Sequence, residues 1–547
     1  MNLFARDMTP TVDLTQRHGT GAVRSQRPIY VDLLPPCNSA CPAGEDIQKW
    51  LGLAQAGKFK AAWEALISDN PMPAVHGRVC YHPCETSCNR KDLDSSVSIH
   101  AVERFLGDQA TTQGWKIPTA VASTGKRVLV VGAGPSGLSA AYHLTRLGHQ
   151  VEIHEAGPLP GGMLHFGIPA YRLPREDLMQ EIRRIEAFGV KIVLNHKVED
   201  LLAEQKAGNF DAAFVAIGAQ QAHHVDIPAR DAARVFSAVN LLHNVETKSA
   251  PTLGRRVVVY GAGNSAMDAA RTARRLGAEE ALIVFIMDKT HMEARAFEAQ
   301  EARDEGVTFK WLSSIKEIDT GAITVERMRM DADGHPQPTG EFETLKADSV
   351  VLALGQEAES GFLKSIPEIT YQSGGIVVVD RAMMTGKPGI FAGGDMVPSQ
   401  RSVTIATGHG KKAARHIDAW LRGRELPNAD KHPGITFAGL NLPIYADAEP
   451  SAQHELALSA RAKGFDEVFG GLTEAQAQHE AKRCLSCGNC FECDNCYAAC
   501  PEDAIIKLGP NNGYEIKLDL CTGCQVCVEQ CPCHAMEMVP EAIEVRT

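Results

Sequence analysis

The sequence lacks the features that mark several classes of protein. No apolar stretch approaches the roughly 20 residues of a membrane-spanning helix, so no membrane span is expected. The opening residues, MNLFARDMTPTV, do not place a charged segment before an apolar one, which argues against a secretory signal peptide. With a net charge of −12 and no basic run, the chain is not expected to bind nucleic acid or an anionic membrane.

Cysteine, by contrast, is plentiful. The 16 cysteines gather in C-x-x-C and C-x-x-x-C runs near the two ends of the chain. Without an export signal, such runs predict metal or cluster ligands in a cytoplasmic protein rather than disulfides. The length of 547 residues allows three or four domains, and the hydrophobic content of 44% is that of a globular protein.

The stretch 126–162 has the pattern of a dinucleotide-binding unit. An apolar run at 128–131 predicts a buried parallel strand, and glycines follow at G-x-G-x-x-G spacing before a helical pattern at 138–147. The start of that helix would face a pyrophosphate, and Glu155, just after a second strand at 151–153, would accept from a ribose. The cofactor contacts predicted here are Gly132, Ala133, Gly134, Pro135, Ser136, Gly137, Glu155, Gly162 and Met163.

A later segment favours FAD for this first site. Residues 390–395 read IFAGGD, an apolar strand whose terminal acid can hold the ribityl chain of FAD. This arrangement resembles the flavoprotein families that bind two dinucleotides. Short apolar strands at 215–218 and 351–355 return the chain toward the flavin. Further cofactor contacts are predicted at Gly218, Gly355, Gly394, Asp395, Val403 and Thr404.

A second unit of the same kind lies between these flavin segments. Residues 256–260 form an apolar strand pattern, and GAGNSA follows as the G-x-G-x-x-A variant before a helix at 267–276. This order predicts a nicotinamide domain inserted in a flavin domain, with contacts at Gly261, Gly263, Asn264, Ser265 and Asp288. Hydride transfer needs stacking and orientation more than acid–base groups, so no catalytic acid or nucleophile is predicted.

The residues after the second strand of this unit favour NADH over NADPH. An NADP site would want arginine for the 2′-phosphate, but Ile286 and Met287 occupy the expected positions. Asp288 is the candidate for the 2′-hydroxyl of NAD. Lys289 leaves NADPH open, because one cation can pair with a phosphate.

Two cysteine runs near the end of the chain have the spacing of a bacterial two-cluster ferredoxin. In such a domain each cluster takes three thiolates from one run and the fourth from the other. The predicted ligands are Cys490, Cys493, Cys496 and Cys531 for one 4Fe–4S cluster, and Cys521, Cys524, Cys527 and Cys500 for the other. Cys533 is left over, and we expect it to be buried without a ligand role.

Five more cysteines stand before the flavin unit, in a region with helical patterns at 46–55 and 58–67. They are Cys37, Cys41, Cys80, Cys84 and Cys88, too few for two four-ligand clusters. Zinc is the alternative, although zinc usually takes C-x2-C pairs. Cys484 and Cys487 follow a helix that begins at Thr473 with a T-x-x-Q capping box. They raise the number of thiols to seven, so an oxygen ligand would be the eighth.

Residues from about 30 to 425 resemble the small subunit of glutamate synthase and the matching half of dihydropyrimidine dehydrogenase. The resemblance is carried by CNSACP, GRVCYHPCETSC, VSIHAVERF, GAGPSG, GGMLHFGIPAYRLP, GAGNSAMD and AGGD. It implies two 4Fe–4S clusters in the helical region. It also implies that Leu164, Arg172 and Val198 lie along FAD.

In that family an R-C-L-x-C pair stands before the first cysteines, whereas here RCLSC occurs at 483–487. We infer that a carboxy-terminal helix returns the pair to the same site. The implied ligands are Cys37, Cys88, Cys484 and Cys487 for one cluster, and Cys41, Cys80, Cys84 and Glu103 for the other. Glu103 is included because the family places Gln or Glu at this position of the VERF segment.

The sequence therefore predicts an α/β protein with two Rossmann-like dinucleotide-binding domains, the nicotinamide domain being inserted in the FAD domain. An N-terminal helical iron–sulfur domain and a C-terminal ferredoxin-like domain complete it. The expected ranges are 1–118 (helical), 119–250 and 361–425 (FAD), 251–360 (nicotinamide), 426–483 (linker and helix) and 484–547 (ferredoxin-like).

The predicted function is electron transfer between NADH or NADPH and a catalytic oxidoreductase subunit or ferredoxin, within a hetero-oligomeric complex. FAD and four 4Fe–4S clusters would carry the electrons. Two alternatives stay open. One is a glutamate synthase-type or pyrimidine-type reductase subunit that works with a separate catalytic chain, and the other is a non-enzymatic iron–sulfur docking or assembly protein.

Overall fold

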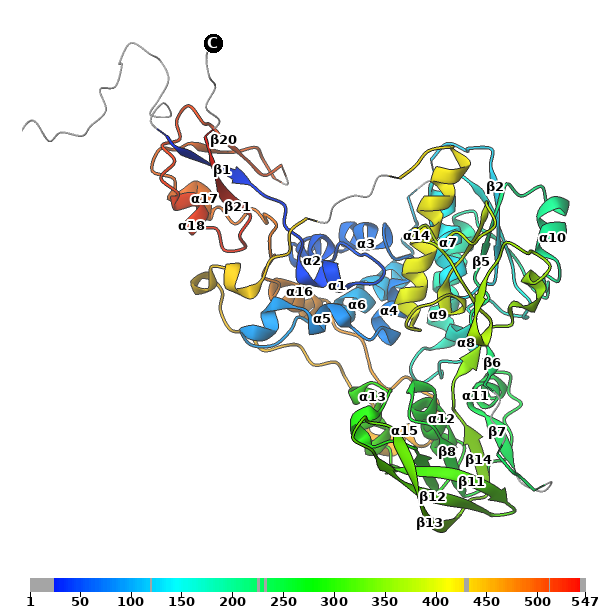
Figure 1. Ribbon diagram of the computed structural model, residues 1–547. Coiled ribbons are helices and arrows are strands. Elements are labelled where there is room, and N and C mark those ends of the chain that lie inside the picture. The colour runs from blue at the N-terminus through cyan, green and yellow to red at the C-terminus, as the bar shows by residue number, and fades with distance from the viewer. Residues whose placement is uncertain are drawn as a thin grey trace, which may run out of the picture.

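The computed structural model describes residues 24–118, 121–223, 227–230, 234–426, 432–510 and 512–541. Figure 1 shows the ferredoxin-like end on one side, the helical region in the middle, and the two nucleotide-binding sheets on the other side. Among the described residues, no helix has both the length and the apolar character needed to cross a lipid bilayer.

The first nucleotide-binding sheet has five parallel strands in the order β18-β5-β2-β3-β4. They are β2 (Arg127–Val131), β3 (Gln150–His154), β4 (Lys191–Val193), β5 (Ala212–Val215) and β18 (Ile390–Ala392). The central strands are covered on both faces, which explains their continuous apolar runs. Helices α7 (Pro135–Arg146) and α14 (Val403–Leu421) pack so closely that a Cβ at Gly410 would lie 2.2 Å from the Ser136 carbonyl oxygen. Also in this region are α8 (Met163–Phe166), α9 (Arg175–Ala187), α10 (Leu201–Ala207), β16 (Tyr371–Gln372) and β17 (Ile376–Val377).

The second nucleotide-binding sheet is also parallel, in the order β10-β9-β8-β14-β7. Its strands are β7 (Val235–Ser237), β8 (Arg256–Tyr260), β9 (Glu280–Val284), β10 (Val307–Lys310) and β14 (Ser349–Leu352). Its helices are α11 (Ala238–Glu246), α12 (Asn264–Arg275) and α13 (Ala296–Asp304). An antiparallel sheet packs beside it, formed by β11 (Ser313–Asp319), β12 (Ala322–Met330) and β13 (Pro336–Lys346).

The chain passes between the two sheets through two short segments that pair with each other. They are β6 (Gln221–Ala222) and β15 (Gln356–Glu357). The second sheet starts earlier in the chain than the expected boundary at 251, because β7 belongs to it. Sequence pattern missed β7 because it is a short, half-buried edge strand without an apolar run.

The helical region surrounds a core that contains Trp50, Trp63 and Phe105, and it takes one helix from the far end of the chain. Its helices are α1 (Pro36–Ala40), α2 (Ile47–Gln55), α3 (Phe59–Ile67), α4 (Pro73–Val79), α5 (Pro83–Thr86) and α6 (Ile99–Thr112). The added helix is α16 (Glu474–Lys482), whose Ala477 and Ala481 are buried in the same core. The T-x-x-Q capping box is present at its start. The short α15 (Leu458–Arg461) precedes it.

The ferredoxin-like end joins the beginning of the described chain to its end. Strand β1 (Gln26–Tyr30) pairs antiparallel with β21 (Met536–Pro540), as Figure 1 shows. The other elements are α17 (Asn495–Ala499), α18 (Val526–Glu529), β19 (Ile505–Lys507) and β20 (Tyr514–Ile516). Residues 26–30 were expected to belong to the helical domain. They belong to the ferredoxin-like end instead, because their backbone hydrogen bonds go to β21. Residues 1–23, which also fall in that expected domain, lie outside the described ranges.

Candidate functional site

A cavity of about 770 Å³ opens beside the carboxyl ends of the first sheet and reaches the second sheet. It brings together most of the predicted cofactor contacts from segments far apart in the sequence. From the flavin segments it is lined by Gly132, Gly134, Pro135, Ser136, Glu155, Gly162, Met163, Leu164, Val198, Gly218, Gly394, Asp395 and Val403. From the nicotinamide segment it is lined by Gly263, Asn264, Ser265 and Gly355.

The first glycine motif has the geometry that a bound pyrophosphate requires. Gly132 has a φ of +102°, which few other residues adopt, and a Cβ at Gly137 would lie 1.9 Å from the Gly132 carbonyl oxygen. Nothing lies within 4 Å of the Cβ position at Gly134, which faces the cavity. Helix α7 begins at Pro135, so its positive end points at this open space.

Glu155 is fixed at the end of β3 by two backbone donors. Its carboxylate accepts hydrogen bonds from the N–H of Ala133 and the N–H of Gly157, each at 2.7 Å. These contacts hold the side chain at the edge of the cavity, where a ribose hydroxyl is expected.

Two polar groups show that this cavity suits a polar cofactor such as FAD. The Ser136 hydroxyl is buried and has no hydrogen-bond partner among the described residues. Burial raises the pKa of Asp395 from 3.8 to about 6. Gly394, with a φ of +75°, approaches Ser136 so closely that a Cβ there would lie 3.1 Å from the Ser136 Cβ, and Ser136 and Asp395 both line the cavity. A ligand that offered hydroxyl and phosphate groups would satisfy both side chains.

Six predicted contacts lie outside the cavity lining: Ala133, Gly137, Arg172, Gly261, Asp288 and Thr404. Arg172 pairs with Asp268 at 2.8 Å and with Glu298, so its guanidinium ties the flavin region to α12 and α13. The expectation that Arg172 lies along FAD therefore does not match its contacts. Thr404 donates its hydroxyl to the Cys80 Sγ at 3.0 Å, which places it between the cavity and a cysteine of the helical region.

The second glycine motif has the same turn as the first, but no acidic residue takes the position of Glu155. Gly261 has a φ of +128°, and a Cβ there would lie 2.3 Å from the Ala353 carbonyl oxygen. Strand β9 ends at Val284, so Phe285 takes the place that Glu155 has after β3. The two residues also make equivalent backbone contacts, with Phe285 N–H bonded to Lys310 and Glu155 N–H bonded to Val193.

Asp288 is engaged locally instead of facing the cavity. Its carboxylate caps the short 3-10 helix Lys289–His291 and accepts from the Thr290 N–H at 2.9 Å. Hydrogen bonds from Thr290 and His291 lower the pKa of Asp288 to about 2. The carboxylate that was expected to select NADH is therefore committed to its own loop.

Sequence pattern missed Tyr81, which lines the cavity and accepts a hydrogen bond from the Asn264 side chain. The guanidinium of Arg295 lies over its ring, 5.0 Å from the centroid. Its position next to Cys80 was the available signal, but only the fold brings it to the second glycine motif.

Four thiols from both ends of the chain line one small cavity, here called the split site: Cys37, Cys88, Cys484 and Cys487. Burial raises the pKa of Cys37 well above its ordinary value, and the other three thiols raise it further. Four thiols that oppose each other's ionisation in a buried space fit the donor set of a metal cluster, which would stabilise the thiolate form. This grouping matches the set implied by the family resemblance.

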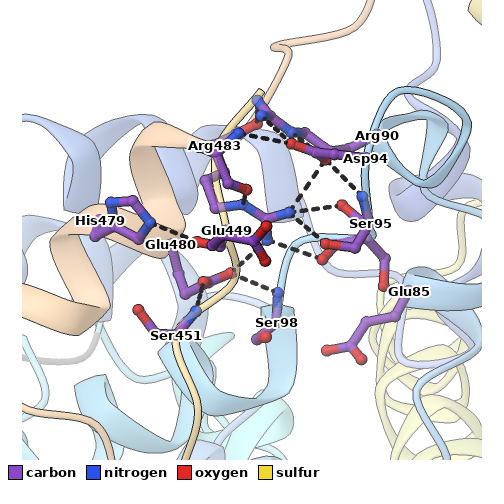
Figure 2. Close-up of polar contacts among 12 residues, drawn as sticks. Glu85, Arg90, Asp94, Ser95, Ser98, Glu449, Ser451, His479, Glu480 and Arg483 are labelled. Atoms are coloured by element: carbon purple, nitrogen blue, oxygen red, sulfur yellow. Dashed lines mark hydrogen bonds and ion pairs between the residues drawn. The ribbon is translucent and has the colours of Figure 1, made fainter. Parts of the chain in front are cut away.

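Arg483 holds the carboxy-terminal pair of the split site in place (Figure 2). It is 1% exposed and donates to Ser95 at 2.7 and 2.8 Å, to Asp94 at 3.2 Å and to Glu480 at 3.0 Å. Its own carbonyl accepts from Arg90 at 2.7 Å. These contacts join α16 to the loop that precedes α6, so the RCLSC segment is returned to the N-terminal cysteines.

A second group lies on the side of the helical region that faces the flavin cavity: Cys41, Cys80, Cys84 and Glu103. Burial raises the pKa of each thiol, and the neighbouring Glu103 carboxylate raises it further. Burial and Glu45 raise the pKa of Glu103 well above its ordinary value. Glu103 accepts from the Asn70 amide at 2.7 Å. A buried carboxylate so close to three thiols fits an oxygen ligand of a cluster.

The ferredoxin-like end contains two more thiol-lined cavities, and their members cross between the two cysteine runs. One is lined by Cys490, Cys493, Cys496 and Cys531, and the other by Cys500, Cys521, Cys524 and Cys527. Both groupings match the spacing-based prediction. Cys533 also lines the first of these cavities, and its thiol donates to the Asn489 carbonyl at 3.2 Å. None of the 16 cysteines, all of which lie in the described ranges, forms a disulfide.

Comparison with known proteins identifies the family. The model described as pyridine nucleotide-disulphide oxidoreductase matches residues 126–410. The model described as dihydropyrimidine dehydrogenase domain II, 4Fe-4S cluster, matches residues 15–115. The chain belongs to the pyridine nucleotide-disulphide oxidoreductase family.

Three relatives extend the match well beyond one domain. The beta subunit of an NADP(+)-dependent formate dehydrogenase from Moorella thermoacetica is 34% identical, over 83% of this chain and 70% of that protein. The beta subunit of an NADPH-Fe(3+) oxidoreductase from Geobacter sulfurreducens is 32% identical, over 83% and 75%. The small chain of glutamate synthase [NADPH] from Escherichia coli K12 is 32% identical, over 71% and 89%.

The family confirms the fold class, the resemblance to glutamate synthase small subunits, and an oxidoreductase that uses FAD, a nicotinamide dinucleotide and 4Fe–4S clusters. The preference for NADH is not supported. All three relatives are named for NADP(+) or NADPH, and Asp288, on which the preference rested, does not face the cavity.

Proposed function

We propose that this chain is the electron-transfer subunit of a larger complex, which moves electrons between NADPH and a partner oxidoreductase or ferredoxin. The observation that carries the proposal is the succession of four thiol-lined sites that leads away from the dinucleotide cavity. When bound, FAD exchanges a hydride with the nicotinamide and passes single electrons to 4Fe–4S clusters, which carry one each.

The first junction in this succession lies between the dinucleotide cavity and the helical region. Thr404 follows Val403, which lines the cavity, and its hydroxyl reaches the Cys80 Sγ at 3.0 Å. The site of Cys80 is thus in contact with the first turn of α14. A hydrogen bond to a ligating sulfur also favours the reduced cluster, because it stabilises the added negative charge.

The remaining junctions follow from short separations along the chain. Cys37 and Cys41, and likewise Cys84 and Cys88, belong to neighbouring sites and stand four residues apart. Cys487 and Cys490 link the split site to the ferredoxin-like end, and two further pairs, Cys496 with Cys500 and Cys527 with Cys531, link its two sites. Since a chain spans at most about 3.6 Å per residue, four residues keep the Cα atoms of neighbouring ligands within about 14 Å of each other.

NADPH is favoured over NADH by the names of the relatives and because the residue directly after β9 is not acidic. Phe285 offers no acceptor for a 2′-hydroxyl. Lys289 follows in the same loop, also outside the cavity lining, and is the candidate cation for a 2′-phosphate. The ratio of kcat/KM for NADPH to that for NADH tests this point, and a preference for NADH would overturn it.

A hetero-oligomeric complex is supported by the relatives, which are beta subunits and a small chain. A glutamate synthase-type subunit that works with a separate catalytic chain remains a second candidate, favoured by the match to 89% of the Escherichia coli small chain. Adding glutamine and 2-oxoglutarate to the isolated complex separates the two, since only this candidate predicts glutamate formation.

The test of the main proposal is anaerobic reduction of the full chain by NADPH, followed by absorbance and electron paramagnetic resonance. We expect the flavin to be reduced first and cluster signals to follow, with iron for four clusters per chain. Reduction of the flavin with clusters that stay oxidised, or zinc in place of iron, would overturn the proposal.

A further inference from the structure

Two histidines and a glutamate meet beside the dinucleotide cavity, outside every thiol-lined site. His154 ends β3, His196 follows β4, and Glu204 lies on α10, which Figure 1 places at the edge of the flavin-type sheet. The Glu204 Oε1 is 3.2 Å from His154 Nδ1 and 3.1 Å from His196 Nε2. One ligand atom from each residue lies within 4.8 Å of the other two.

His154 is the residue whose surroundings need an explanation. Its ring is 5% exposed, and its two nitrogens face two different carboxylates. Nε2 bonds to Glu152 Oε1 at 3.0 Å, whereas Nδ1 is buried near Glu204 without a hydrogen bond. A neutral imidazole has only one N–H, so one nitrogen would direct its lone pair at a carboxylate oxygen.

A cation between His154 Nδ1 and Glu204 resolves this conflict. Nε2 then carries the proton and donates it to Glu152, while Nδ1 is free to bind the cation. Metal-bound histidines commonly donate their other N–H to a carboxylate in this way. Glu152 is itself held by Lys191, 3.1 Å away, so the supporting carboxylate is fixed and its charge is balanced.

We propose that His154, His196 and Glu204 bind a zinc ion. Two imidazoles and one carboxylate are a donor set that zinc accepts, with a water in the fourth position. Zinc–ligand bonds of about 2.0–2.2 Å put neighbouring ligands of a tetrahedron about 3.3–3.5 Å apart. The two measured contacts to Glu204 are close to that spacing.

The site would brace the wall of the dinucleotide cavity. His154 and His196 both line this cavity, and His154 directly precedes Glu155, the residue expected to hold a ribose. The ion would join the end of β3 to the stretch from the segment after β4 to α10, which lies more than 40 residues further along the chain. It would also keep the His154 ring from rotating into the cavity.

The experiment measures zinc and iron in the intact holoprotein after anaerobic incubation with zinc chloride and desalting. We expect wild-type protein to retain about one more zinc per chain than His196→Ala or Glu204→Gln, at equal iron. Glu152→Gln, which removes the supporting carboxylate, should weaken zinc binding about 10–100-fold. The matched control is His335→Ala, an exposed histidine beside Asp331 on the β12–β13 hairpin.

Iron content shows whether each variant has folded, and Glu204→Gln keeps the size of the side chain if His196→Ala does not fold. Equal zinc in wild type, His196→Ala and Glu204→Gln, or no retained zinc in wild type, would overturn the proposal. The three residues would then be a hydrogen-bonded cluster only. The readout is zinc, so the outcome is independent of the electron-transfer function.

Discussion

The split site and the two ferredoxin-like sites each have four thiols, but the sequence specifies the two kinds of site in different ways. In the ferredoxin-like sites, three ligands come from one short run, so the spacing itself defines the site. In the split site, Cys484 and Cys487 join Cys37 and Cys88 from the other end of the chain. Each ferredoxin-like site therefore needs one local run and one thiol from the neighbouring run, whereas the split site needs a helix docked from the far end of the chain.

The largest expected effect comes from removing the thiols that cross between the two ends. Cys484→Ser with Cys487→Ser should lose one cluster's worth of iron and stop reduction of the ferredoxin-like clusters, because the split site is the one that joins them to the helical region within the described ranges. Reduction of the flavin by NADPH should continue. Iron analysis and paramagnetic resonance measure this, with Cys490→Ser plus Cys493→Ser as the locally specified counterpart. Unchanged iron in the first variant would contradict the split site.

The next effect tests whether docking of α16 sets the split site. Arg483→Met removes the buried cation and leaves Asp94 and Glu480 with one partner fewer, at a cost of about 3–5 kcal/mol. Hydrogen exchange over 474–482 should accelerate, and iron from the split site should be lost first. Lys482→Met, an exposed neighbour, is the matched control. Equal exchange in both variants would mean that Arg483 does not hold the helix.

A smaller effect concerns Asp395, which joins the flavin site from a distant segment. Burial raises its pKa from 3.8 to about 6, so the flavin-free protein is stabilised by the protonated form. That contribution is fully present below about pH 4 and is lost as pH rises through 6, which corresponds to roughly 2–3 kcal/mol. The stability of Asp395→Asn relative to wild type should therefore increase by this amount between pH 4 and pH 8. Urea unfolding of flavin-free protein measures it, and a constant difference would argue against a buried Asp395.

The smallest effect is expected at Asp288. Because its carboxylate caps its own loop, Asp288→Asn should leave the NADPH-to-NADH ratio of kcat/KM nearly unchanged. Lys289→Ala should lower that ratio, since it removes a cation from the same loop. A large change in the Asp288 variant would show that this carboxylate selects the dinucleotide after all.

The comparison also explains which predictions were reliable. Both glycine motifs produce the expected strand, turn and helix, because the turn at Gly132 and the turn at Gly261 each leave no room for a side chain. The expectation that Asp288 faces the dinucleotide differs from the structure, because the order of residues does not show where β9 ends. The contacts of Arg172, Thr404 and Tyr81 depend on how the helical and nucleotide-binding regions pack, which no local pattern encodes.

The sequence by itself determined what depends on neighbours along the chain: the two nucleotide-binding units, the ferredoxin-like thiol sets and the capped start of α16. These features follow from backbone conformation and ligand spacing within a few residues. Only the tertiary structure decided that β1 pairs with β21, that Thr404 reaches Cys80, and that His154 faces Glu204. Such contacts join distant segments, and they form only because the cores between those segments are buried together.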